Sequence, residues 1–193
     1  MNTTSHLILN LAILRRPTQP QVTWPVLVGA FLPDAAMFVF YGWARFWAGL
    51  PNSTIWSEAF FAPFWQDIFA VGNSVPLAGL GLGIAYLRRQ PLWMAGFASM
   101  LLHHLFDLPL HNDDAHRHFF PLSDFRFISP VSYWDPNHYG VLAALVELVA
   151  VLLASVYLLR LIKSRWGRAA LLLTNGLTMI FYLGFYVRPL WAA

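Results

Sequence analysis

Long apolar runs, separated by short polar or basic segments, dominate the sequence and predict a bundle of transmembrane helices. A helix needs about 20 apolar residues to cross a bilayer. We expect five such helices, at about 22–44, 68–87, 91–110, 139–162 and 169–190. A shorter apolar run at 5–14 is too short for a full crossing, and Arg15, Arg16 and two prolines end it. This run predicts either an interfacial helix or a half-helix inside the protein.

Prolines, glycines and aromatic residues punctuate these runs. Pro33 predicts a bend within the first span, because proline removes one helical hydrogen bond. The segment 45–67 is rich in Trp and Phe, which is typical of a loop at the membrane–water interface. Three small residues in the second span, Gly79, Gly81 and Gly83, predict close helix packing. The remaining local predictions are a cap at Ser5, a helix end at Pro109, a cap plus first-turn proline at Asp135–Pro136, and an interhelical hydrogen bond from Asn175.

The composition agrees with this reading. The chain is 58% hydrophobic and 11% charged, whereas an ordinary soluble domain has about 25% charged residues. We therefore expect an all-α, polytopic helical membrane protein in which residues 1–193 form a single integral membrane domain. The net charge of +3 does not indicate nucleic-acid binding, because the basic residues flank apolar runs instead of forming a patch. Arg15 and Arg16 follow the first apolar run, which argues against a cleavable signal peptide.

The basic residues are distributed unevenly between the two ends of the predicted spans. Eight of them fall on one side: Arg15, Arg16, Arg88, Arg89, Arg160, Lys163, Arg165 and Arg168. The positive-inside rule makes that side cytoplasmic. The loop 111–138 is then expected on the outer side, which is the periplasmic side if the membrane is a bacterial inner membrane.

Candidate chemistry is concentrated between residues 103 and 138. This stretch holds six of the seven histidines. Since the chain has no cysteine, a metal ion such as zinc would have to be held by imidazole and carboxylate groups. An ordinary polar loop explains the part after Pro121 but not His103, His104 and Asp107, which lie in an apolar run where unpaired ionisable groups are costly.

The depth of the ionisable residues provides a second indication. At about 1.5 Å per helical residue, His6, Asp34 and His103 each lie roughly 15–18 Å from the basic end of their segments. Asp107 lies roughly 24 Å from that end, and Glu147 roughly 12 Å inward from the opposite end. These positions predict one layer near the middle of the membrane. A shared cation would neutralise the carboxylates together.

Several of these residues also occur in segments that resemble a known family. The segments are His6, the GAFLPD run at 29–34, the HxxxD pattern at His103–Asp107 and the HFFPLSDFRF run at 118–127. They are similar to the membrane-bound metal-dependent hydrolase family related to the LexA-regulated inner-membrane proteins (the DUF457 group). The resemblance covers about two thirds of the chain.

The resemblance implies His6, Asp34, His103 and Asp107 as metal ligands. The family's HRGxTHS segment is missing here, because residues 35–102 contain no histidine. Either His111, His116 and His118 take its place, or catalysis is lost.

The leading functional hypothesis is a zinc-type hydrolase acting on a lipid or lipid-linked substrate, with a phosphoester favoured over an amide or ester. A metal ion in such a site activates a water molecule and polarises the bond that is attacked. The ligands would be His6, Asp34, His103 and Asp107, with His111 as an additional candidate. Glu147, Asp113 or His116 would act as general base, and Arg117, with His118, would bind the substrate anion.

Two alternatives use the same residues. In a metal- or proton-coupled transporter, the acids near the midplane would relay cations. In a non-catalytic assembly factor, a metal would only hold the helices together.

Overall fold

The structure, a computed structural model, describes residues 1–187, and every regular element within them is helical. Four helical segments are long and apolar enough to cross a membrane: Pro20–Trp47, Pro63–Leu87, Gly140–Leu161 and Arg165–Val187. The main helices are α1 Thr3–Leu14, α2 Thr23–Gly42, α3 Asn52–Ser57, α4 Pro63–Gly72, α5 Val75–Leu87, α6 Pro91–Asp107, α7 Gly140–Leu161 and α8 Arg165–Tyr182. The predicted all-α membrane architecture with a short N-terminal helix is confirmed at this level.

Three expected elements differ from the observed ones. The predicted span 68–87 is two helices, α4 and α5, which break at Asn73–Ser74. The segment 45–67 is not simply a loop, because it contains α3 and the first half of α4. The helix predicted at 91–110 is present as α6, but it is not among the four segments that are long and apolar enough to cross a membrane. The end of the predicted fifth span, at 188–190, lies outside the described residues.

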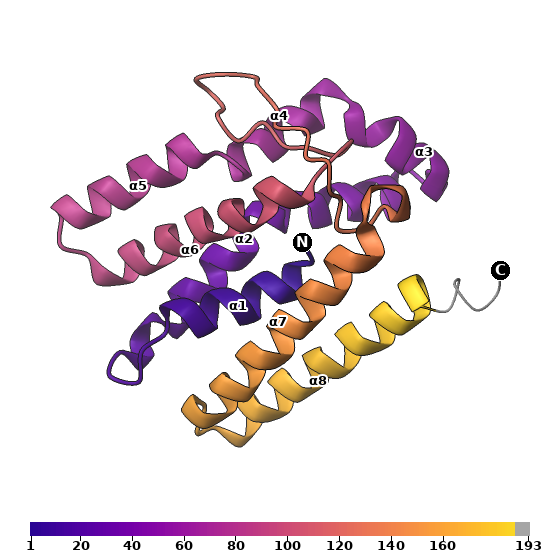
Figure 1. The fold of residues 1–193 in the computed structure, drawn as a ribbon. Helices are drawn as coiled ribbons and strands as arrows, with labels where there is room; N and C mark the ends of the chain where they lie inside the picture. The colour runs from indigo at the N-terminus through magenta and orange to yellow at the C-terminus, as the bar shows by residue number, and fades with distance from the viewer. Residues whose placement is uncertain (188–193) are drawn as a thin grey trace.

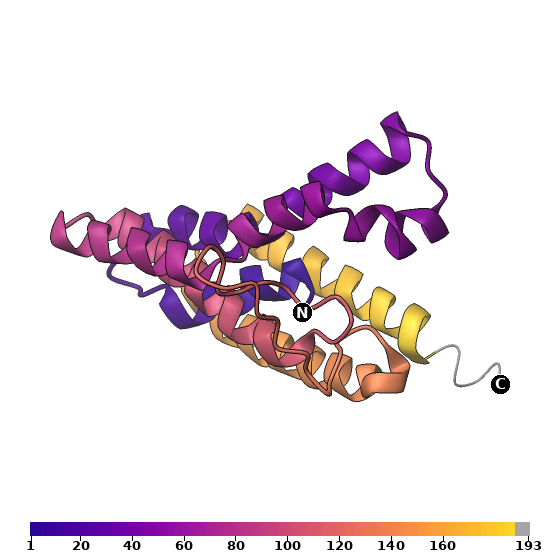
Figure 2. The same cartoon turned by 90° about the horizontal axis from the view of Figure 1, so that it is seen from above.

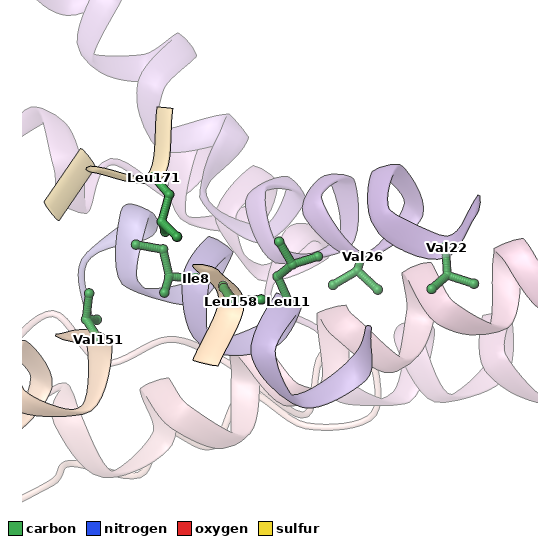
Figure 3. Close-up of a cluster of buried hydrophobic side chains, with 7 residues drawn as sticks. All are labelled: Ile8, Leu11, Val22, Val26, Val151, Leu158 and Leu171. Atoms are coloured by element: carbon green, nitrogen blue, oxygen red, sulfur yellow. The ribbon is translucent and has the colours of Figure 1, made fainter. Parts of the chain in front are cut away.

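The helices pack in the spatial order α5, α6, α2, α1, α7, α8, so that the short helix α1 lies inside the bundle (Figure 1). Its residues Ile8 and Leu11 belong to a buried cluster drawn from α1, the start of α2, α7 and α8 (Figure 3). The other members are Val22, Val26, Val151, Leu158 and Leu171. Because five residues of α1 are buried, it is a half-helix inside the protein and not an interfacial helix.

Hydrogen bonds join the three helices that surround the centre. The Asn10 amide of α1 donates to the Ser99 carbonyl of α6 at 2.8 Å. The Ser99 hydroxyl donates in turn to the Val26 carbonyl of α2 at 2.7 Å. A Cβ atom on Gly29 would lie 2.1 Å from the Gly96 carbonyl oxygen, so α2 and α6 cross in close contact here. This crossing determines how α2 and α6 present their polar residues to each other.

The two ends of the bundle differ in composition. The α1–α2, α5–α6 and α7–α8 connections, where eight of the twelve basic residues are found, lie at one end (Figure 1). The opposite end carries α3, α4 and the loop 111–138, and α3 with the end of α2 stands away from the main body (Figure 2). Exposed aromatic residues occur at both ends, as expected for two membrane interfaces. They include Trp24, Trp93 and Trp166 near the basic connections, and Phe46, Trp47 and Phe64 at the other end.

The local predictions have mixed outcomes. Asn175 does make an interhelical hydrogen bond, donating to the Ser155 hydroxyl at 2.8 Å. Ser5 does not cap α1, because the cap position is Asn2. Asp135 caps only the short 3-10 turn Pro136–His138, and α7 begins later, at Gly140. Of the three glycines in α5, only Gly81 packs closely, against the Phe97 ring. Gly79 and Gly83 have open space around them.

Candidate metal centre

One histidine from α1 meets a histidine and an aspartate from α6 in the centre of the bundle. Ligand atoms of His6, His103 and Asp107 all lie within 4.8 Å of one another, and all three residues are buried. His103 and Asp107 share a helix face because they are four residues apart. Two ligands on one zinc ion are about 3.3 Å apart at usual zinc–ligand distances. Small side-chain shifts would therefore bring the group to metal-binding geometry.

The hydrogen bonding of His103 indicates which of its nitrogens is free to bind. Its Nδ1 lies 2.8 Å from the Ala30 carbonyl oxygen, and a carbonyl only accepts, so Nδ1 carries the hydrogen. In the neutral ring, Nε2 then presents a lone pair. That atom lies 3.0 Å from Asp107 Oδ2 and 3.5 Å from Asp34 Oδ1, yet it makes no well-directed hydrogen bond within residues 1–187. The Nε2 lone pair and the two carboxylates repel one another unless a proton or a cation lies between them. A metal ion at this point would satisfy all three groups, so these residues fit a metal ion.

His6 and Asp34 complete the inner group from two further helices. His6 Nε2 lies 2.9 Å from Asp107 Oδ1, and its ring stacks on that of His103 with centroids 3.6 Å apart. Two positively charged rings would repel each other in this stack, so at least one of them is neutral, the form in which imidazole binds a metal. The Thr3 hydroxyl donates to Asp34 Oδ2 at 2.6 Å and thus holds this carboxylate beside His103.

A second layer of polar contacts surrounds Asp107. The backbone nitrogen of Met1 lies 2.7 Å from Asp107 Oδ1, and His111 Nε2 lies 3.6 Å from the same oxygen. Glu147 Oε1 accepts hydrogen bonds from both the backbone and the side-chain nitrogen of Asn2. Its other oxygen, Oε2, has no hydrogen-bond partner among the described residues. Glu147 is therefore linked to the centre through the start of α1 and not through direct contact with the histidines.

A cavity of about 530 Å³ adjoins this group. Its polar wall includes Asp34, His111, Asp113, Asp114 and His116, and its apolar wall contains aromatic side chains from α3 and the following turn. The aromatic residues are Trp56, Phe60 and Phe61. The cavity thus places carboxylates and imidazoles opposite an apolar surface.

The structure brings most of the predicted site residues together but separates three of them. His6, Asp34, His103, Asp107 and His111 form the centre, and Asp113 and His116 line the adjoining cavity. Glu147 instead faces a second, mainly apolar cavity of about 610 Å³ between α1, α6 and α7.

Arg117 and His118 lie outside the first cavity. The Arg117 guanidinium pairs with Asp67 at 2.5 Å and with Asp124 at 2.9 Å. His118 is buried against the α4–α5 junction, where its Nδ1 lies 3.1 Å from the Asn73 carbonyl oxygen. Binding of a substrate anion by these two residues stays a prediction.

Electrostatics distinguish the two loop histidines of the cavity. Burial lowers the pKa of His111, but the carboxylates of Asp107 and Asp114 outweigh it, so the pKa is raised above its usual value. Burial and the neighbouring His111 lower the pKa of His116 to about 3. His116 is therefore a neutral imidazole at pH 7, whereas His111 sits beside anions that favour a positive charge.

Several residues of the centre carried little signal in the sequence. Thr3 and Asn2 orient Asp34 and Glu147, but short polar residues at a helix start usually indicate capping alone. Asp114 lies 2.9 Å from His111 Nδ1, although nothing in the loop sequence separates it from Asp113. Tyr133 reaches the cavity from more than 20 residues along the same loop, a proximity that local sequence patterns do not encode.

No protein-family model, curated protein or solved structure matches the chain. The fold and the His/Asp geometry are therefore the basis for any functional assignment.

Proposed function

We propose that this protein is a membrane-embedded, zinc-dependent hydrolase that cleaves a phosphoester bond in a lipid or lipid-linked substrate. The observation that carries this proposal is the position of the buried His6, His103 and Asp107 group, with Asp34, beside a cavity that is polar on one side and aromatic on the other. The resemblance of the His6, GAFLPD and HxxxD segments to membrane-bound metal-dependent hydrolases favours the same reaction class.

The donor set fits zinc. Imidazole and carboxylate groups are usual zinc ligands in catalytic sites, where three protein ligands leave a position for water or substrate. His6, His103 and Asp107 provide such a set, Asp34 lies beside it, and His111 lies 3.6 Å from Asp107. When bound, the metal would activate a water molecule and stabilise the charge that develops on the substrate.

Other residues of the chain would orient the metal ligands and accept a proton. The Ala30 carbonyl orients the His103 ring through Nδ1, and Thr3 orients Asp34. Such contacts to the far side of a ligand usually hold its ring orientation and protonation. Asp113 is exposed in the cavity and is our preferred general base. His116 also lines the cavity, but its pKa of about 3 makes it a weak base.

The walls of the cavity support a lipid substrate. Four helical segments are long and apolar enough to cross a membrane. Trp56, Phe60 and Phe61 form an apolar wall at the end of the bundle where we expect a membrane interface. An amphipathic substrate can place its head group at a metal ion held beside Asp34 and its apolar part against these rings. We place this end on the outer, periplasmic side of a bacterial inner membrane, because the basic connections lie at the opposite end.

Metal content and hydrolysis of a defined lipid test the proposal together. Purified protein in detergent is assayed for bound zinc and for release of inorganic phosphate from phosphatidic acid in mixed micelles. Asp34→Asn and Asp107→Asn each keep the side-chain shape and remove one charge. If both residues hold the same metal, each single variant should lose most of the zinc and activity, and the double variant should lose little more. Asp124→Asn, at an exposed loop position, is the matched control.

The alternative functions give different results in the same preparation. Stoichiometric zinc without hydrolysis, together with cation flux in liposomes, would indicate a transporter. Stoichiometric zinc with neither activity would indicate a structural metal in an assembly factor. Additive losses of thermal stability in the two variants, with no stoichiometric metal in the parent protein, would refute the metal centre itself.

A further inference from the structure

A second group of histidines lies next to the first, on the opposite side of His103. His104 follows His103 in α6, so its side chain points in a different direction around the helix, toward the α4–α5 junction. The ring centroids of His104 and His118 are 5.8 Å apart, and those of His118 and His116 are 5.9 Å apart. All three residues are buried.

Two of these rings are anchored on adjacent backbone carbonyls. His104 Nε2 lies 3.2 Å from the Gly72 carbonyl oxygen, and His118 Nδ1 lies 3.1 Å from that of Asn73. These carbonyls belong to the end of α4, where the helix itself supplies no donors. Because a carbonyl only accepts, both ring nitrogens carry the hydrogen. The opposite nitrogens, His104 Nδ1 and His118 Nε2, are then left with lone pairs.

The free nitrogen of His104 requires an explanation. His104 Nδ1 is buried and has no hydrogen-bond partner among the described residues, and a buried unsatisfied polar atom costs about 1–3 kcal/mol. Capping of α4 explains only the nitrogens that face Gly72 and Asn73. Metal-binding histidines typically show this pattern, with one ring nitrogen hydrogen-bonded to a backbone carbonyl and the other on the metal.

The rings of the three histidines lie wider apart than imidazoles on one ion, and their ligand atoms do not all come within 4.8 Å of one another, so a bound ion would draw them together. A zinc–nitrogen distance of about 2.0 Å places each ring centroid about 3 Å from the metal, so two centroids are about 5 Å apart in tetrahedral geometry. The observed 5.8 and 5.9 Å exceed this by less than 1 Å. His116 and His118 lie in the same loop, 111–138. A shift of that loop would bring both rings closer to α6.

We propose that His104, His118 and His116 form a second metal-binding site, separate from the His6, His103 and Asp107 group. Its ligands are all neutral nitrogen donors, in contrast to the carboxylate-containing first centre. Such a site selects borderline transition metals such as Zn²⁺ or Co²⁺ over Mg²⁺ and Ca²⁺, which prefer oxygen ligands. The proposal does not depend on hydrolase activity, because it rests only on these three histidines and on the carbonyls at the α4–α5 junction.

Two conservative substitutions separate metal binding from helix capping. The Asn amide nitrogen occupies a position near Nδ1 of histidine, and the Gln amide nitrogen a position near Nε2. His118→Asn therefore keeps a donor for the Asn73 carbonyl, and His104→Gln keeps one for the Gly72 carbonyl. Each variant removes only the nitrogen that is free to bind a metal. His138→Asn is the control, since His138 pairs with Asp135 at 2.6 Å on the loop surface.

Metal-depleted protein in detergent is titrated with Co²⁺ alone, and its visible absorption and stoichiometry are measured. We expect two ions per chain in the parent protein and in His138→Asn, and one ion in His118→Asn and His104→Gln. Asp107→Asn should lose the first ion and keep the second, so failure of the first centre is distinguishable from failure of the second. His116→Ala should weaken the second binding step by at least tenfold.

The thermal midpoint of the metal-free variants completes the test. It should remain at the parent value in His118→Asn and His104→Gln, because the capping hydrogen bonds persist. The proposal is overturned if these variants bind as many ions as the parent protein, or if the parent chain binds no ion that survives Asp107→Asn. An unchanged midpoint together with an unchanged ion count would show that the histidines serve only as caps for α4.

Discussion

Replacing Gly29 with alanine should disturb the metal centre from a distance, through the crossing of α2 and α6. The added Cβ atom would lie 2.1 Å from the Gly96 carbonyl oxygen and 2.9 Å from Ser99 Cβ. An ordinary carbon–oxygen contact is about 3.3 Å or longer, so the two helices must separate by roughly 1 Å at this point. Overpacking of this kind costs about 1–3 kcal/mol. For a chain of this length, that corresponds to a thermal midpoint lower by roughly 3–10 °C.

The same displacement should weaken metal binding. The residue after Gly29, Ala30, accepts the hydrogen bond from His103 Nδ1 at 2.8 Å, and Ser99 donates to Val26 at 2.7 Å across the same interface. Separating the helices lengthens both hydrogen bonds and releases the His103 ring. Losing such a contact to the far nitrogen of a ligand typically lowers metal affinity 10–100-fold. We expect a loss of that size for zinc.

Gly96→Ala is the matched control at the same crossing. Its Cβ atom would lie 3.5 Å from the Pro25 carbonyl oxygen, an ordinary contact, and alanine is favoured over glycine within a helix by up to about 1 kcal/mol. We expect an unchanged or slightly higher midpoint and unchanged zinc affinity. The assays are thermal unfolding in detergent and competition with a zinc chelator. An unchanged midpoint in Gly29→Ala would refute the close crossing, whereas a lower midpoint with parental zinc affinity would refute the role of Ala30.

Three further predictions concern topology, the short helix and the loop. Labelling of intact cells from outside should modify Ser123→Cys and spare Gln90→Cys, because the basic connections are expected in the cytoplasm; the reverse pattern would contradict the orientation. His6→Ala should lower zinc content without removing the protein from the membrane, since the four long apolar segments remain; unchanged zinc would exclude His6 as a ligand. Arg117→Gln should change phosphatidic acid hydrolysis less than twofold, because the guanidinium pairs with Asp67 and Asp124 and does not line the cavity. A tenfold rise in KM would restore it as an anion-binding residue.

The sequence predicted the helices well where apolar runs ended at strong signals. Pro109 follows the end of α6, and Arg15 follows the end of α1. The break between α4 and α5 was missed because apolar residues continue on both sides of it. Ser74 caps α5 by accepting from the Leu77 amide at 3.1 Å, and a proline lies in the first turn of that helix. These capping residues are visible in the sequence, but the continuous apolar run around them favoured the prediction of a single helix.

Depth along each helix identified the inner group, but it could not assign directions around the helix axis. His6, Asp34, His103 and Asp107 were placed in one layer by counting residues, and the structure brings them together. Glu147 was assigned to the same layer, yet it faces Asn2 and the second cavity. Rotation about the axis depends on the packing of neighbouring helices. Contacts such as the Gly29–Gly96 crossing set that packing, and a single sequence does not reveal them.

The ionisable residues of α6 explain why this helix lies inside the bundle. On a lipid-facing surface, His103, His104 and Asp107 would each carry a large desolvation cost. Between α2 and the end of α4, His103 and His104 instead find the backbone carbonyls of Ala30 and Gly72. Those carbonyls satisfy one nitrogen of each ring and leave His103 Nε2 and His104 Nδ1 without well-directed hydrogen bonds. Hydrogen bonds to these carbonyls account for one nitrogen of each ring, and the two proposed metal sites account for the other nitrogens, which point in different directions around α6.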